Sequence, residues 1–173
     1  MAIVWSATIF LSAFLLFLVQ PMMAKMILPM LGGTPAVWNA CMLFFQTSLL
    51  AGYGYVHLLN SWVAPRRQVF VHLLLLAVPL FLLPIGIPAA WTFPDQTNPV
   101  LWVLLLLTVS IGLPFFMLST TAPLLQKWFS WTPHPSARDP YFLYAASNAG
   151  SMVALLGYPF AIEPWVPLRG TQG

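Results

Sequence analysis

Long hydrophobic blocks alternate along the chain with short polar clusters. Five of these blocks are close to the roughly 20 residues that an α-helix needs to cross a bilayer. They cover residues 3–30, 36–59, 69–87, 100–128 and 141–162. Helices are expected because lipid cannot satisfy exposed backbone groups, and the sequence lacks the short alternating segments of a β-barrel. The pattern predicts an all-α fold, a polytopic integral membrane helical bundle with about five transmembrane helices.

Three of the expected helices start with a capping residue followed by proline. Thr, Asn and Asp side chains accept hydrogen bonds from free backbone N–H groups, and proline is favoured at the first helical position. The three pairs are Thr34-Pro35, Asn98-Pro99 and Asp139-Pro140. Gly32-Gly33 predicts a tight turn and an antiparallel hairpin of the first two helices. Residues 1–164 are expected to form one transmembrane domain, followed by a short tail, 165–173.

The composition supports a membrane location. Hydrophobic residues make up 60% of the 173 positions and charged residues only 5%, whereas a soluble domain carries about a quarter charged residues. The lipid bilayer is therefore the expected partner. The basic residues form no stripe, so no nucleic-acid partner is expected. The first block lacks a preceding basic region and is too long for a cleavable signal, so it is expected to be retained.

The basic residues predict the orientation. Loops on the cytoplasmic side of a membrane carry an excess of Lys and Arg. Arg66 and Arg67 follow the second block, and Lys127 and Arg138 follow the fourth; Lys25 and Arg169 lie toward the opposite side. The excess predicts a cytoplasmic N-terminus.

Lys25 is the costliest residue in the first block, because a lysine at the bilayer centre costs at least about 2.5–3.5 kcal/mol. Two interpretations stay open: an anchor at the interface, or a charge facing a polar cavity or a partner. Glu163, at the end of the fifth block, is the expected partner, and Asp95 is its rival. Gln20 lies one turn deeper, beside Pro21, which is expected to kink the helix.

Seven polar residues are candidates for a polar path or for contacts between helices: Gln20, Lys25, Gln46, Ser119, Thr120, Asn148 and Glu163. Ordinary helix packing explains most of them equally well, since such side chains hydrogen-bond across membrane helices. The small residues between Tyr144 and Ser151 predict tight packing of the fifth helix. The sequence shows no Ser/His/Asp set, paired carboxylates, phosphate loop or metal-ligand spacing, so no enzyme activity, cofactor or metal is expected.

Three long stretches carry a resemblance to a known family. "SAFLLFLVQPMMAKMILPMLGGTPAVWNACMLFFQ" (12–46), "LSTTAPLLQ" (118–126) and "YFLYAASNAGSMVALLGYPFAIEP" (141–164) resemble, in order, the membrane region of bacterial fused transporter-like/spermidine-synthase-like proteins. The resemblance implies a location in the bacterial inner membrane. It also implies further helices and a synthase-like cytoplasmic domain. That domain has no counterpart in this sequence, so its catalytic role is carried over to no residue.

Three functions remain open at this point. The chain is expected to be the membrane region of such a fusion protein, with a transport or scaffold role and no catalysis of its own. Alternatively, it is a membrane anchor or subunit for a separately encoded spermidine-synthase-like enzyme, or a truncated fragment without function. Other membrane helices are further expected partners.

Overall fold

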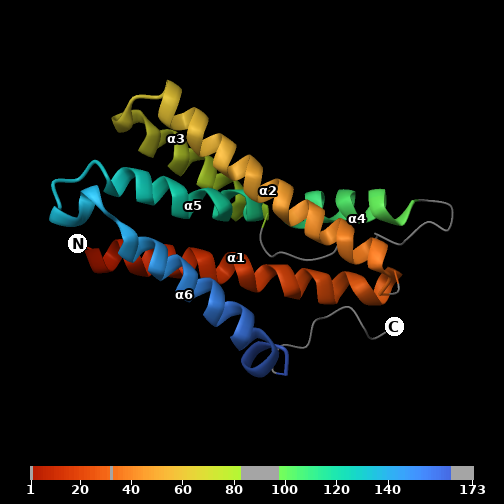
Figure 1. Ribbon diagram of the computed structural model, residues 1–173. Helices are drawn as coiled ribbons and strands as arrows, with labels where there is room; N and C mark the ends of the chain where they lie inside the picture. Colours follow the sequence, from red (N-terminus) through yellow and green to blue (C-terminus); the bar gives the residue numbers. More distant parts are fainter. Residues whose placement is uncertain (1, 32, 83–97, 165–173) are drawn as a thin grey trace. The chain divides into compact units, whose positions relative to one another are not determined.

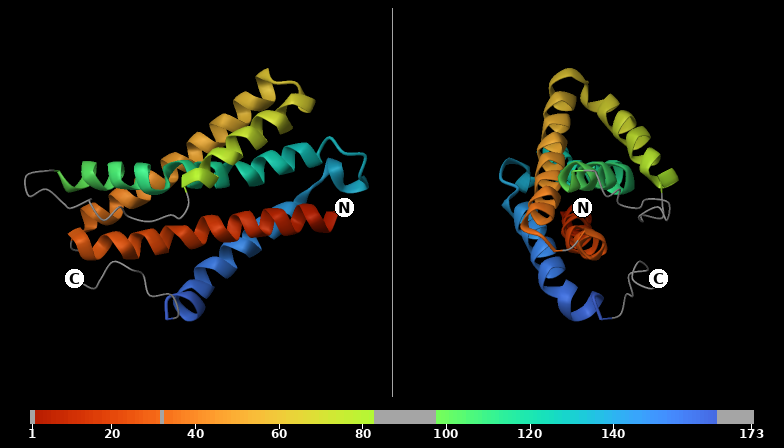
Figure 2. Two further views of the ribbon diagram at one scale, coloured as in Figure 1. Left: turned by 180° about the vertical axis from the view of Figure 1, so that it is seen from behind. Right: turned by 90° about the vertical axis from the view of Figure 1, so that its right-hand side faces the viewer.

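A computed structural model describes residues 2–31, 33–82 and 98–164 (Figures 1 and 2). These residues form helices and no strand, which confirms the all-α prediction for them. The elements are α1 (Ala2–Leu31), α2 (Pro35–Trp62), α3 (Pro65–Ala77), the 3-10 helix η1 (Val78–Leu82), α4 (Pro99–Leu107), the π-helix η2 (Thr108–Gly112), α5 (Leu113–Phe129), the 3-10 helix η3 (Pro135–Arg138), α6 (Tyr141–Gly157) and the π-helix η4 (Tyr158–Ile162).

Each of the five expected blocks contains helix, with one displaced start. The third helix begins at Pro65, whereas the block was expected to begin at residue 69. Pro65 occupies the first helical position, where its missing N–H costs nothing. Arg66 and Arg67 consequently lie in the first turn of α3, not in a loop. The expected end of this block, residue 87, lies outside the described residues.

Two of the three predicted helix caps are confirmed. The Val37 N–H donates to Thr34 Oγ1 at 3.5 Å, and the Val100 N–H donates to Asn98 Oδ1 at 2.9 Å. The third prediction was wrong: Pro140, not Asp139, caps α6, and no side chain supplies a hydrogen bond there. Asp139 instead ends the preceding η3 turn, where its backbone N–H donates to the Ser136 carbonyl at 3.2 Å.

Three helical stretches among the described residues are long and apolar enough to cross a membrane: Ala2–Leu28, Pro65–Leu82 and Pro99–Ser130. α2 does not belong to this set, although it has 28 residues and no charged side chain. Its polar and small residues lower its hydropathy. Length and composition alone therefore support three crossings, not the expected five.

Close contacts divide the described residues into two compact units, and each unit is described by itself. Unit 1 consists of residues 2–21 and 118–164. Unit 2 consists of residues 22–31, 33–82 and 98–117. The boundaries fall inside two helices, after Pro21 in α1 and after Met117 in α5.

The core of unit 1 forms around Phe129. It contains Ile9, Ala137 and Leu143, all buried. The Trp5 ring packs edge-on against Phe129, with ring centroids 5.6 Å apart. The start of α1, the end of α5 and the connection from α5 to α6 therefore lie at the same end of this unit.

The backbones of α1 and α6 approach each other closely in unit 1. A Cβ atom added to Gly150 would overlap the Phe10 carbonyl oxygen and lie 3.2 Å from Phe10 Cα. Only glycine fits there, which confirms the predicted tight packing of this small-residue segment. On α1, the Ser12 hydroxyl donates to the Leu118 carbonyl of α5 at 3.2 Å.

In unit 2, α2 packs against both α3 and α4 (Figures 1 and 2). The Phe45 ring meets Phe115 of α5 with centroids 4.9 Å apart. α3 runs back along α2 as a hairpin after the short connection at Val63 and Ala64. The helices α2, α3 and α4 thus form one packed group.

Candidate functional site

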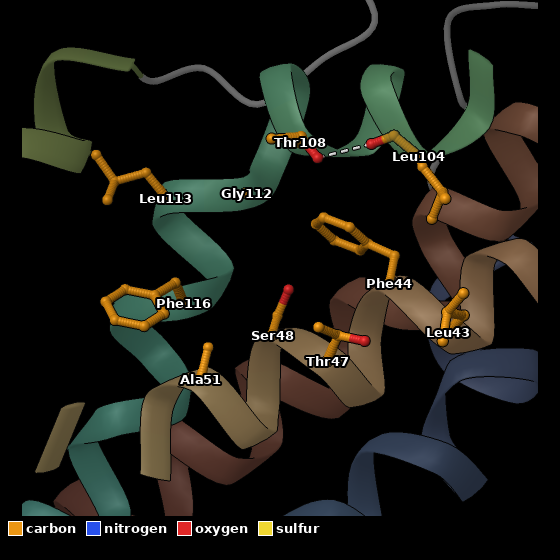
Figure 3. A pocket seen from close by; sticks show the side chains of 10 residues that line it. All are labelled: Leu43, Phe44, Thr47, Ser48, Ala51, Leu104, Thr108, Gly112, Leu113 and Phe116. Carbon is orange, nitrogen blue, oxygen red and sulfur yellow. Dashed lines mark hydrogen bonds between the residues drawn. The ribbon is translucent and has the colours of Figure 1, made fainter. Parts of the chain in front are cut away.

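A groove able to hold a ligand lies in unit 2 between α2 and the continuous helix α4–η2–α5 (Figure 3). Its volume is about 660 Å³. α2 contributes Leu43, Phe44, Thr47, Ser48 and Ala51, and the facing wall contributes Leu104, Thr108, Gly112, Leu113 and Phe116. The name "α2–α5 groove" is used for this feature below.

The π-helix η2 shapes the wall of the α2–α5 groove. Pro114 follows it by two residues and has no N–H to donate to the preceding turn, a common reason for a local change in helix winding. The Thr108 hydroxyl donates to the Leu104 carbonyl at 2.7 Å, within its own helix (Figure 3). Gly112 adds no side chain, and the nearest atoms to a Cβ atom added there, on Thr108 and Leu107, would lie at ordinary contact distances of 3.6–3.9 Å.

The lining of the groove determines what it can bind. It is largely hydrocarbon, with hydroxyls from Thr47, Ser48 and Thr108 and no charged side chain. Its volume lies within the roughly 300–1,000 Å³ typical of ligand sites. Such a surface suits an apolar group, such as a lipid chain or a side chain of another helix, better than a charged solute.

A buried polar cluster joins α2 to α3 in the same unit. Gln68 has none of its surface exposed. Its Nε2 atom donates to the Val63 carbonyl at 2.8 Å and to the Leu59 carbonyl at 3.3 Å. The Val63 carbonyl follows the last turn of α2, where helix carbonyls lack internal donors. The Leu59 carbonyl also accepts from the Val63 backbone N–H at 3.0 Å. Gln68 therefore caps α2 from the neighbouring helix.

His72 lies one turn further along α3 and is also buried. Its Nδ1 atom lies 3.4 Å from the Tyr55 hydroxyl of α2. The Tyr55 ring packs edge-on against Phe116, which also lines the groove, with centroids 5.9 Å apart. Neither Gln68 nor His72 was among the candidate residues predicted from the sequence. Their spacing of four residues puts them on one face of the helix that follows a short connection, and this spacing could have predicted that both face α2.

The seven predicted polar residues lie in different environments. Ser119 and Thr120 are buried in unit 1, with 4% and 0% of their surface exposed. Asn148 and Glu163 of the same unit are exposed, as is Gln46 in unit 2, while Gln20 and Lys25 are half-buried. None of the seven lines the α2–α5 groove.

The predicted pair of Lys25 and Glu163 joins residues of different units and stays a prediction. Its rival Asp95 lies outside the described residues. Gln20 has a more definite feature: its Nε2 atom is buried without a hydrogen-bond partner, as is Ser110 Oγ. An unsatisfied buried group of this kind costs about 1–3 kcal/mol.

Among the described residues, no group of three His, Cys, Asp or Glu side chains is placed to hold a metal ion. Comparison of the chain with known protein families, curated proteins and solved structures found no match in any of the three. The function therefore rests on the residues and their geometry.

Proposed function

We propose that this chain is a multi-pass membrane unit of the bacterial inner membrane that serves as a non-catalytic scaffold or anchor. One observation carries the proposal: several buried polar side chains form hydrogen bonds from one helix to another. Ser12 joins α1 to α5, and Gln68 joins α3 to the end of α2. In a bilayer the hydrophobic effect does not drive helices together, so hydrogen bonds of this kind contribute to helix association.

The proposed topology has five crossings and a cytoplasmic N-terminus. α2 supports this count because it packs between α3 and α4, which both belong to stretches of membrane-spanning length. A charge-free helix of 28 residues is about 42 Å long, enough to cross the roughly 30 Å hydrocarbon core with some tilt. α6 supports it through its close backbone contact with α1 at Gly150.

The proposed partner of the anchor is a spermidine-synthase-like enzyme on the cytoplasmic side. The resemblance of residues 12–46, 118–126 and 141–164 to the membrane region of synthase fusions supports this choice. In the proposed topology, Arg66 and Arg67 in the first turn of α3 face the cytoplasm and are exposed. They offer positive charge to an acidic surface of the enzyme.

A co-flotation experiment tests the anchor. A tagged spermidine-synthase-like enzyme of the same genome is expressed with or without the chain, and membranes are floated on a density gradient. The enzyme is expected to float only with the chain, and Arg66→Glu/Arg67→Glu is expected to release it. An unrelated soluble enzyme of similar size serves as the control. An enzyme that stays soluble in the presence of the chain contradicts the proposed partner.

Transport is the second candidate function, and the α2–α5 groove favours it. A cavity of about 660 Å³ between membrane helices has the size of a small-molecule site. Purified chain in sealed vesicles should then take up an apolar or weakly polar solute. Gly112→Leu, which fills the groove wall, should abolish uptake, whereas Gly157→Leu, at a position with open space around it, should not.

A further inference from the structure

The outward face of α2 carries an unusual set of residues for a membrane helix. The residues that α2 buries in unit 2 include Val37, Phe44, Phe45 and Val56, all apolar. On the opposite face, Asn39 and Gln46 are exposed. These two amide side chains thus point away from the apolar face that packs in the unit.

These exposed residues follow a regular spacing. The residues of what is called here the α2 seam are Asn39, Leu43, Gln46, Leu50, Tyr53 and His57, separated alternately by four and three residues. All six are exposed, and Leu43 also lies at the edge of the α2–α5 groove. Alternating steps of four and three define the contact line between two helices that wind around each other at a small angle. The α2 seam therefore has the pattern of a helix–helix interface whose second helix is missing from the unit.

The two amides determine what can cover the seam. Among the described residues, the side chains of Asn39 and Gln46 have no hydrogen-bond partner. Lipid chains offer neither donors nor acceptors, so an amide facing them stays unsatisfied. A covering helix must bring polar groups to two positions seven residues apart.

A second copy of the same chain meets this requirement. Copies inserted in the same orientation and related by a two-fold axis along the membrane normal place their α2 helices parallel. Like residues then meet across the axis. An amide carries both donors and an acceptor, so it pairs with its own copy. The leucines at positions 43 and 50 fill the layers between the amide layers, as in a parallel coiled coil.

We propose that the α2 seam is the interface between two copies of this chain, with Asn39 and Gln46 each hydrogen-bonded to the same residue of the partner copy. The inference rests on the proposed five-crossing topology, in which α2 lies within the bilayer. It goes beyond that proposal because it assigns an oligomeric state and a contact surface.

Cysteine cross-linking tests the interface. The single cysteine, Cys41, is first replaced by alanine, and Leu50→Cys is added near the middle of α2. Leu74→Cys on α3 is the matched control, because Leu50 and Leu74 have 72% and 73% of their surface exposed. Full-length chain in vesicles is oxidised with copper phenanthroline. Cross-linked dimer is expected for Leu50→Cys and not for Leu74→Cys; equal cross-linking at both sites, or at neither, overturns the proposal.

A substitution at the amides tests their role. Asn39→Leu/Gln46→Leu should raise the dimer dissociation constant in bilayers roughly tenfold, as followed by energy transfer between labelled copies. Asn148→Leu, an exposed amide on α6, should change it by less than about twofold. An unchanged constant in the double variant shows that the amides do not pair. Dimerisation seen only with a different polypeptide present assigns the seam to that partner and overturns the second copy.

A labelling control separates failure of the interface from failure of the topology. If α2 crosses the membrane, Leu50→Cys resists a water-soluble maleimide in sealed vesicles. Resistance together with absent cross-linking overturns the dimer and leaves the topology intact. Rapid labelling overturns the crossing of α2 itself, and the dimer proposal falls with it.

Discussion

One pair of helices in each unit is joined by a different kind of contact. In unit 1, α1 and α6 come into backbone contact because Gly150 has no side chain to separate them. In unit 2, α3 is joined to α2 by hydrogen bonds: the Gln68 side chain donates to carbonyls at the end of α2. The comparison shows that one membrane-type chain uses both close apolar packing and buried hydrogen bonds, each in a different place.

The first prediction breaks the contact in unit 1 and should have the largest effect. Gly150→Val places a branched side chain against the Phe10 backbone, which cannot move as a flexible side chain would. The free energy of unfolding in mixed micelles should fall by about 3 kcal/mol. Gly157→Val, in the same helix with open space around the added Cβ, is the control and should cost less than about 1 kcal/mol. Equal losses for the two variants would show that helix propensity, not close approach, is the cause.

The second prediction breaks the contact in unit 2. Gln68→Leu keeps the apolar bulk but removes the donor to Val63 and Leu59. The stranded carbonyl should lower the free energy of unfolding by about 2 kcal/mol. Gln126→Leu on α5, half-buried, is the matched amide control and should change the free energy by less than about 0.5 kcal/mol. A Gln68→Leu variant as stable as the wild type would show that the hydrogen bonds of Gln68 to the end of α2 do not stabilise unit 2.

The third prediction sharpens the account of unit 2. Tyr55→Phe keeps the ring against Phe116 and deletes only the hydroxyl that lies near His72. The expected loss is about 1 kcal/mol, the usual net value of one hydrogen bond. Tyr144→Phe, with its ring exposed on α6, should be neutral within error. The same unfolding measurement reports both variants.

The fourth prediction sharpens the account of unit 1 and should have the smallest effect. Ser12→Ala removes the hydroxyl that donates to the Leu118 carbonyl. The expected loss is about 0.6 kcal/mol, the average for a hydrogen bond between membrane helices. A loss larger than that of Gln68→Leu would reverse the contrast between the units and make unit 1 the more dependent on polar contacts.

Local features were predictable where one segment determines its own structure. The caps at Thr34 and Asn98 follow from a side chain beside its own helix, and both predictions are confirmed. Asp139 carried the same signal, but the η3 turn before it uses its backbone, and the cap prediction failed. The competing turn is also local, and its residue Ala137 is buried in the core of unit 1.

The candidate site was predictable only in part. Gln46 and Asn148 were singled out as polar residues in apolar blocks, but their polarity alone does not distinguish a path from a packing face. Gln68 and His72 were overlooked because they lie near a helix start that the hydrophobic pattern placed four residues too late. Their burial depends on the α2–α3 hairpin, which no single segment reveals.

By itself, the sequence determined that the described residues are helical and that the chain carries helices apolar enough for a bilayer, because backbone satisfaction and the hydropathy of a segment are properties of that segment. The five spans that it predicted are reduced to three by length and composition once the helix bounds are known. The tertiary structure alone decided which glycine permits contact, which glutamine caps a helix, and which face of α2 is left with its amides exposed. These properties depend on distances between residues far apart in the chain. Periodicity limits such distances without setting them, since the same helix face can meet a neighbour, a groove or lipid.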